Sequence, residues 1–376
     1  MHIQPSGDGH HDVTFTWIET DPRAPAKDVL VRLVAVTDGA QDNGDIRPYL
    51  MSAGQPDGRW SLTLRLPSQL RSSYQLCPVR DEPVPSHPSE ERFLEILGMG
   101  VPDSTNPATL AAGATYGNPG VASILELPDA LPQPWLARRR QSVRGTMIRH
   151  LVGSDQEEPA IVHVYLPPDG RSARLPLAIL FDADCWLGMG IADMFDNLIV
   201  DRVVPPFVAV AIESIHGVPR LWSLTHPDIF EPFLTEELLP WMQTRYAVSA
   251  DPVQTVLAGQ SLGGLTCAHA ARSRPDRFGW VIGQSTSVWW PGDDNGGLGG
   301  RQVLDAYATG AHLPIRFFLE VGSHEGELLQ SVRSLRDVLE ERQYTLRYRE
   351  YEGGHDFACW RGGLADGLIV ALRGPA

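Results

Sequence analysis

The stretch Thr255-Val256-Leu257-Ala258-Gly259-Gln260-Ser261-Leu262-Gly263-Gly264-Leu265 decides how the rest of this chain is interpreted. Small and β-favouring apolar residues lead into Gly-Gln-Ser-Leu-Gly, and the Ala-rich segment 265–271 that follows favours a helix. A strand, a sharp turn with serine at its tip and a helix form the context of the G-x-S-x-G nucleophile elbow. The backbone at the serine is strained, so small residues are expected at Gly259 and Gly263. Ser261 is therefore the candidate nucleophile.

The elbow pattern alone is weak evidence, because 36 of the 376 residues are glycine, so its partners must decide. A serine nucleophile needs a histidine base, and three histidines follow Ser261 in the chain. His269 lies two turns into the predicted helix, and His312 precedes a predicted strand. His355 lies in the glycine loop 353–357 after the last predicted strand, where the triad histidine is expected. We therefore predict His355 as the general base.

The acid that orients this histidine is expected just beyond the preceding strand, 315–321. Glu325 follows the glycine that ends this strand and is the favoured residue. Glu327 is an alternative, although a carboxylate there suits the first turn of the next helix. A serine–histidine dyad without an essential acid is the remaining possibility.

Two backbone N–H groups are expected to hold the oxyanion. One belongs to Leu262, the first residue after the serine, and the other to the loop 182–186, at Cys185 or Asp184. Cys185 is also a rival nucleophile, but no histidine is disposed to serve it.

Composition limits the classes of partner. Apolar residues make up 43% and charged residues 20% of the chain, as in a soluble globular protein, and the formal charge is −15. That charge argues against nucleic acid or an anionic membrane as partner. No segment has a signal peptide pattern or membrane-spanning length, so a cytoplasmic protein is expected. The four cysteines have no zinc-site or disulfide spacing, and no metal ion or organic cofactor is predicted.

The pattern of apolar residues divides the chain into four parts. Short alternating strands with turn residues between them predict a small β-sandwich, a proline-rich segment follows, and apolar strands alternating with helical segments then predict an α/β domain. The predicted boundaries are a disordered leader at 1–12, a sandwich at 13–97, a connector at 98–141 and an α/β-hydrolase domain at 142–376. In the last domain, strands are predicted at 145–152, 160–166, 177–182, 207–212, 255–258, 280–283, 315–321 and 346–351, and helices at 190–201, 230–246, 262–272, 326–342 and 360–372.

Three motifs together resemble the bacterial enterochelin (enterobactin) esterases, in the esterase-D-like branch of the α/β-hydrolases. They are Gly259-Gln260-Ser261-Leu262-Gly263-Gly264-Leu265, Gly283-Gln284-Ser285 leading to Trp289-Trp290-Pro291, and Gly354-His355-Asp356 continuing to Cys359-Trp360-Arg361-Gly362-Gly363-Leu364. The early strands and the proline-rich connector resemble that family's N-terminal domain, so the resemblance covers nearly the whole chain. The last two motifs are much more specific than the elbow.

The resemblance implies a fold, a reaction and a set of residues. It implies cytoplasmic hydrolysis of the tri-serine lactone of a catecholate siderophore, with or without bound iron(III). Ser261, Glu325 and His355 fall on the positions of the family's catalytic serine, acid and histidine. Catechol rings are flat, and the ferric complex is anionic, so aromatic and cationic side chains are expected in the pocket. The candidates for substrate contact are Trp186, Trp289, Trp290, Arg220 and Arg361.

Departures from the family pattern leave the substrate open. Asp182-Ala183 stands where the family usually has Asp-Gly, and Ser223 replaces a glutamate of the pocket loop. Two rival functions therefore remain: a serine hydrolase of the same branch acting on another aryl, feruloyl or macrolactone ester, and a binding protein without turnover. The sequence leaves the oligomeric state open.

Overall fold

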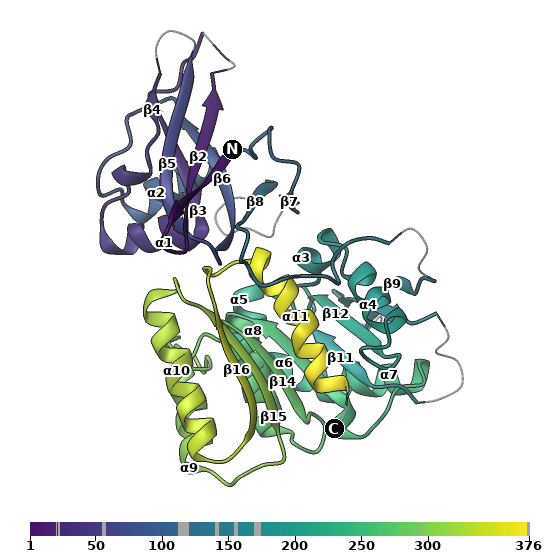
Figure 1. Ribbon diagram of the computed structural model, residues 1–376. Coiled ribbons are helices and arrows are strands. Elements are labelled where there is room, and N and C mark those ends of the chain that lie inside the picture. The colour runs from purple at the N-terminus through teal and green to yellow at the C-terminus, as the bar shows by residue number, and fades with distance from the viewer. Residues whose placement is uncertain are drawn as a thin grey trace. The chain divides into compact units, whose positions relative to one another are not determined.

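The chain forms two compact units (Figure 1). In this computed structural model the described residues are 1–19, 21, 23–54, 58–111, 120–139, 143–153, 157–168, 174–293 and 295–373. The first unit consists of Met1–Pro132 with the segments Gly322–Gly326 and Tyr351–Cys359; the second consists of Gln133–Val321, Glu327–Glu350 and Trp360–Ala376. Among the described residues, no helix is long and apolar enough to cross a membrane.

Two four-stranded sheets make up most of the first unit. Their facing apolar side chains share one core, in which the rings of Phe15 and Tyr74 lie 5.0 Å apart, edge to face. The predicted β-sandwich is thus confirmed. One sheet has the order β1 (His2–Gly7), β2 (His10–Ile18), β5 (Arg59–Pro67), β4 (Ser52–Ala53), and the other has the order β3 (Asp28–Leu33), β6 (Arg71–Val79), β8 (Ala122–Glu126), β7 (Thr109–Leu110).

Two helices accompany these sheets. Helix α2 (Glu90–Gly98) packs its apolar side on residues of β3 and β6. Strand β3 ends at Leu33, and the chain continues directly into α1 (Val34–Asn43). The Thr37 hydroxyl accepts a hydrogen bond from Leu33 N–H and donates one to Val31 O. At the end of β3 this side chain thus bonds backbone groups that a further strand would otherwise bond. A 3₁₀ turn, η1 (Arg47–Tyr49), follows.

Two predictions for the first unit are wrong. The predicted disordered leader, 1–12, contains β1 and the start of β2, which pair through a turn at Asp8 and Gly9. Both turn residues have positive φ, 50° and 69°, as the tight turn of a hairpin requires. The predicted connector, 98–141, supplies β7 and β8, and the Asn106 amide bonds the Ile124 carbonyl within it. Residues 112–119 and the predicted boundary at 141/142 lie outside the described residues.

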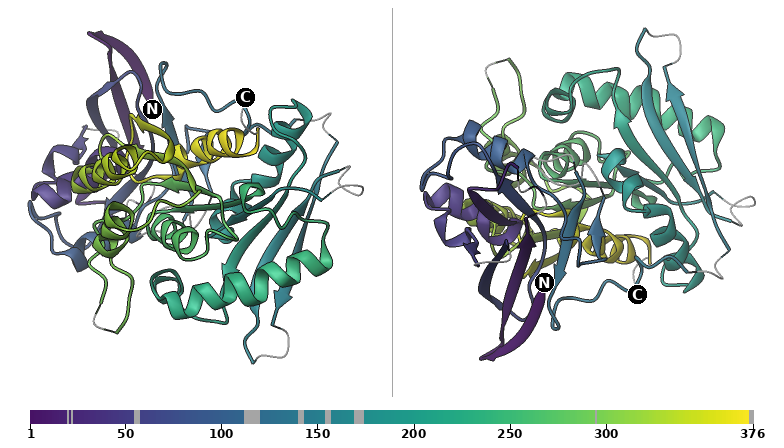
Figure 2. Two further views of the ribbon diagram at one scale, coloured as in Figure 1. Left: turned by 90° about the horizontal axis from the view of Figure 1, so that it is seen from below. Right: turned by 90° about the horizontal axis from the view of Figure 1, so that it is seen from above.

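An eight-stranded sheet forms the centre of the second unit. Strands β12, β11, β13, β14 and β15 run parallel to one another, whereas β10 is antiparallel to both β9 and β12. Helices lie on both faces (Figure 2), which explains why the strands are continuous apolar runs. This confirms the predicted α/β-hydrolase domain. The strand order is β16 (Thr345–Tyr351), β15 (Arg316–Gly322), β14 (Trp280–Gln284), β13 (Thr255–Gln260), β11 (Leu177–Leu180), β12 (Val208–Ser214), β10 (Ala160–Leu166), β9 (Thr146–Val152).

The helices of this unit differ from prediction mainly where they are short. The predicted helix at 230–246 is divided by a π-helical turn, since Pro232 and Pro240 lack the N–H donors of a continuous α-helix. Helices α3, α5 and α9 are not predicted. The helices are α3 (Ala183–Gly188), α4 (Ile191–Val200), α5 (Arg220–Thr225), α6 (Pro227–Pro232), the π-helix η2 (Phe233–Leu238), α7 (Leu239–Arg245), the 3₁₀ turn η3 (Pro252–Gln254), α8 (Leu262–Ser273), α9 (Gly300–Thr309), α10 (Gly326–Glu341) and α11 (Phe357–Leu372).

Candidate active site

Ser261 occupies the turn between β13 and α8, as predicted. Its φ of 55° and ψ of −120° lie outside the regions that a side chain ordinarily allows. Its N–H donates to Gln284 O at 2.9 Å, and its carbonyl accepts from Ser287 N–H at 3.1 Å. The end of β14 thus holds the strained turn from both sides. This is the geometry of a nucleophile elbow.

The glycines around the serine have unequal roles. A Cβ at Gly259 would lie 2.3 Å from the carbonyl carbon of Gly263, so glycine is required there, a stricter condition than the small residue that was predicted. A Cβ at Gly263 would meet its nearest neighbour, Phe181 Cβ, at 3.6 Å, which is ordinary contact. Alanine therefore fits at this position, which agrees with the prediction of a small residue, and glycine itself is not required. The second tight position is Gly264, where a Cβ would lie 2.7 Å from Thr286 Oγ1.

His355 and Glu325 form a hydrogen-bonded pair. His355 Nδ1 lies 2.6 Å from Glu325 Oε2, and the carboxylate side chain is 1% exposed whereas the imidazole is 39% exposed. The other oxygen, Oε1, accepts from Gly322 N–H at 2.6 Å and from Tyr351 O–H at 3.2 Å. A buried acceptor fixed by other donors can hold the histidine in the tautomer with a proton on Nδ1.

The start of α3 lies beside the elbow. Strands β11 and β13 are neighbours, Phe181 N–H donates to Ala258 O at 3.3 Å, and α3 begins immediately after Asp182. Cys185 is in the first turn of α3, and Leu262 is the first residue of α8. Backbone N–H groups in the first turn of a helix carry the positive end of its dipole.

The Cys185 thiol is unsuited to be a nucleophile. Burial, with the nearby carboxylates of Asp184 and Asp182, raises its pKa to about 12. Its thiolate form is therefore rare at neutral pH.

The predicted tryptophans are in different environments. Trp186 is 1% exposed and packed in the interior, so the prediction that it stacks a substrate ring is contradicted. Trp186 lies on a side of α3 that is buried, whereas the sequence placed this residue in a loop because α3 was not predicted. Trp289 is 53% exposed, and the partly buried Trp290 packs against the core. Their rings lie 5.7 Å apart, edge to face.

Both predicted arginines have side-chain partners. Arg220 binds the carboxylate of Asp182 with two nitrogens, with Nη2 to Oδ2 at 2.7 Å, and its side chain is still 53% exposed. Arg361 Nε donates to Gln133 Oε1 at 3.0 Å. The Arg220–Asp182 ion pair links α5 to the residue directly before α3, so Arg220 also orders the loop that we predict to supply an oxyanion donor.

The sequence prediction missed two residues of the site. The Ser287 hydroxyl lies 3.1 Å from Ser261 Oγ, and the Tyr351 hydroxyl supports Glu325. Ser287 belongs to the polar run Gln284–Ser287 directly after β14, which was the available signal. Among the described residues, no group of three or more His, Cys, Asp and Glu side chains is arranged to hold a metal ion.

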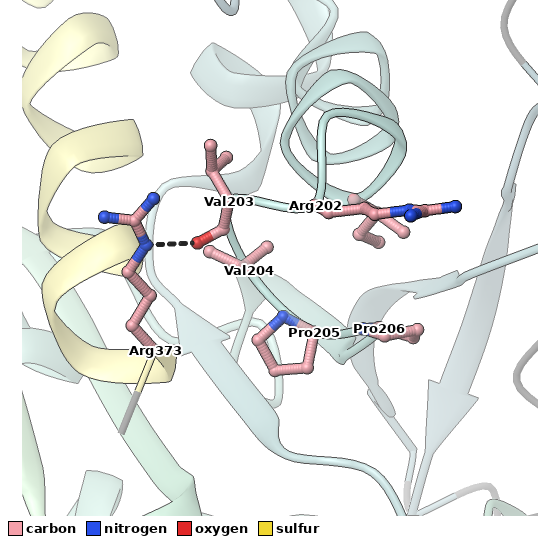
Figure 3. A pocket seen from close by; sticks show the side chains of 7 residues that line it. Arg202, Val203, Val204, Pro205, Pro206 and Arg373 are labelled. Carbon is pink, nitrogen blue, oxygen red and sulfur yellow. Dashed lines mark hydrogen bonds between the residues drawn. The ribbon is translucent and has the colours of Figure 1, made fainter. Parts of the chain in front are cut away.

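A pocket of about 490 Å³ lies apart from these residues (Figure 3). It is bordered by the end of α4, the segment that leads into β12 and Arg373, whose Nε donates to Val203 O at 2.9 Å. The pocket residues 199–206 precede β12, whereas Ser261 follows β13, which runs in the same direction as β11 and β12. The pocket is therefore near the N-terminal ends of these parallel strands, and the elbow is at their C-terminal ends.

Known proteins resemble the chain along its whole length. Residues 12–136 match the family described as "Enterochelin esterase, N-terminal", and residues 155–371 match the one described as "Putative esterase". The chain is 30% identical over 373 residues to the iron(III) enterobactin esterase of Escherichia coli O6:H1 (strain CFT073), covering 95% of this chain and 90% of the relative. The iron(III) salmochelin esterase of the same strain is also 30% identical, over 95% of this chain and 86% of its own length.

Solved structures agree. The enterobactin esterase of Shigella flexneri, determined in the presence of enterobactin, is 28% identical with a TM-score of 0.84, over 99% of this chain and 95% of that one. A ferulic acid esterase of Anaeromyces mucronatus, 17% identical with a TM-score of 0.54 over 64% of this chain and 95% of its own, shares the fold alone. The elbow, the histidine–glutamate pair and the matches to both halves lead to one conclusion: the chain belongs to the enterochelin esterase family and is a carboxylic ester hydrolase.

Proposed function

We propose that this protein hydrolyses the ester bonds of a catecholate siderophore built on a tri-serine lactone, with or without bound iron(III). Cleavage turns a hexadentate chelator into weaker fragments, and the iron is then released in the cytoplasm. The observation that carries the proposal is the buried Glu325 carboxylate bound to His355 Nδ1, in a chain with a strained serine elbow. The names of the relatives support the substrate class.

In the proposed mechanism His355 Nε2 takes the proton of Ser261 Oγ as the oxygen attacks an ester carbonyl. The backbone N–H groups of Leu262 and Cys185 stabilise the tetrahedral oxyanion, each contributing a few kcal/mol. His355 then gives its proton to the departing serine hydroxyl of the lactone, leaving an acyl-enzyme. Water, deprotonated by His355, attacks the acyl group and restores Ser261. Glu325 holds the imidazole and stabilises its charged form throughout.

Substrate contact is proposed at Trp289 and Trp290, which could stack catechol rings, and at Arg220 and Arg361. These cations would offset the formal charge of −15, which otherwise opposes an anionic substrate. The Arg220 side chain is 53% exposed although Asp182 binds it. Trp186 is excluded from this set by its burial.

The test is chromatography of enterobactin, apo and ferric, incubated with the wild type and with Ser261→Ala. Linear trimer, dimer or monomer of dihydroxybenzoyl-serine from the wild type alone is the expected result. Intact trilactone together with rapid hydrolysis of p-nitrophenyl butyrate would mean that the substrate is a different ester. Turnover of neither compound, with saturable binding of the siderophore, would favour a binding protein.

A further inference from the structure

The loop that carries His355 is attached to the sandwich through the next residue, Asp356. Asp356 is 3% exposed, and its carboxylate accepts hydrogen bonds from the start of α11 and from β6. Oδ1 accepts from Ala358 N–H at 2.8 Å, at the start of α11. Oδ2 accepts from Ser73 N–H and from the Ser72 hydroxyl, at 3.2 Å, both in β6. The Ser72 oxygen in turn accepts from Ala35 N–H, at 3.0 Å, in the first turn of α1.

The backbone on either side of His355 is attached in the same way. Arg71 N–H donates to Glu352 O at 3.1 Å, and the Cys359 thiol donates to Arg71 O at 3.2 Å. The two glycines before the histidine fit tightly against the same elements. A Cβ at Gly353 would lie 2.8 Å from Arg71 O, and a Cβ at Gly354 would lie 2.8 Å from Ala35 Cα. Since neither glycine has positive φ, close packing is the reason for glycine here.

We propose that the N-terminal sandwich is part of the catalytic machinery, and that Asp356 is a positioning residue through which β6 and α1 fix the His355 loop. The inference rests on the proposed role of His355 as the base for Ser261. A base must be held within a fraction of an ångström of its productive position, and a displacement of about 1 Å can cost 100-fold in rate. The 351–359 segment forms one compact unit with residues 1–132, which agrees with this role.

The decisive variant is Asp356→Asn. Each carboxylate oxygen faces a backbone N–H, of Ala358 on one side and Ser73 on the other. Either orientation of the amide therefore points its NH₂ group at a donor, and the loop must shift. We expect kcat for p-nitrophenyl butyrate to fall about 10- to 100-fold with little change in KM, and the rate of Ser261 labelling by a fluorophosphonate to fall in parallel. Ser72→Ala removes one donor to Asp356 and the acceptor of Ala35 N–H, and is expected to lower kcat several-fold.

The matched control is Asp103→Asn, which changes another buried carboxylate of the sandwich. Asp103 accepts from Tyr74 O–H at 2.9 Å and from the N–H and hydroxyl of Thr105, at 2.9 and 2.7 Å, and none of these residues belongs to the histidine loop. It should lower the melting temperature and leave kcat per titrated active site unchanged. The double variant Asp356→Asn/Ser72→Ala should lose less kcat than the product of the two single-variant fold-losses, because the two residues share one contact.

The inference is overturned if Asp356→Asn lowers only the melting temperature, as the control does, or if Ser72→Ala and Asp356→Asn act independently on kcat. Both readouts test the serine and histidine without a siderophore. A wild type that fails to react with the fluorophosphonate would instead refute the proposed function itself.

Discussion

Replacing Glu325 with glutamine tests the triad most sharply, because the change is nearly isosteric and the outcome depends on the tautomer of His355. The carboxylate uses both oxygens: Oε2 faces His355 Nδ1 at 2.6 Å and Oε1 faces Gly322 N–H at 2.6 Å. Glutamine has only one acceptor oxygen. If its NH₂ group faced Gly322 N–H, two buried donors would meet, at a cost of about 1–3 kcal/mol.

The amide oxygen is therefore expected to remain on Gly322, and the NH₂ group to donate to His355 Nδ1. Nδ1 must then be the unprotonated nitrogen, and the proton moves to Nε2, which can no longer accept the proton of Ser261. The tautomer penalty of about 1–3 kcal/mol adds to the lost stabilisation of the imidazolium. Together they predict a loss of about 10³–10⁴ in kcat, equivalent to about 4–5 kcal/mol.

The assay is steady-state hydrolysis of p-nitrophenyl butyrate, with KM and the melting temperature measured in parallel. Glu327→Gln is the control, since this exposed carboxylate lies in the first turn of α10 and should affect stability by less than about 1 kcal/mol. A loss below about 10-fold for Glu325→Gln would refute the reasoning and favour a serine–histidine dyad. A large loss for Glu327→Gln would show that the wrong acid was assigned.

Three further predictions follow from the packing around the site. Gly264→Ala should lower the melting temperature by several degrees, because its Cβ would clash, whereas Gly263→Ala should be tolerated; equal effects would contradict the steric argument. Trp289→Ala, at an exposed side chain, should raise KM for a catecholate ester and leave p-nitrophenyl butyrate hydrolysis unchanged. Trp186→Ala, at a buried one, should lower the free energy of unfolding by about 3–5 kcal/mol in chemical denaturation. Cys185→Ser should keep activity within about 3-fold, and iodoacetamide should alkylate the wild-type thiol slowly below pH 9, since its pKa is raised to about 12; rapid inactivation would show a reactive cysteine.

The order of elements was largely predictable because the apolar pattern reports burial. Strands covered on both faces are continuous apolar runs, and each predicted strand of the α/β domain has a counterpart in the sheet. Several of the elements that were not predicted are short. Helices α3 and α5 have six residues each, too few to be stable from propensity alone, and β7 has two. Such elements exist because of tertiary partners, which a single sequence does not show.

The site was predictable to the extent that it depends on position along the chain. Ser261 follows β13, Glu325 follows β15 and His355 follows β16, so the chain order alone nominated them. Their local geometry agrees with those assignments, and their joint action remains a proposal. The burial of Trp186 could not be foreseen, because an aromatic residue after a strand suits a pocket and a core equally well.

The support of the histidine loop could not be predicted either, and the reason is separation in sequence. Asp356 follows His355 directly, which suggested only a family motif, but its Oδ2 accepts from Ser72 and Ser73, more than 280 residues away. Gly353 and Gly354 marked a loop in the sequence, but neither uses a glycine-specific backbone conformation. They are close-packed against Arg71 and Ala35, respectively. These polar and steric contacts on the loop come from the sandwich, where the sequence offered no candidate site residue. If the proposed role of Asp356 holds, a fold boundary drawn from apolar patterns separates residues that act in one reaction.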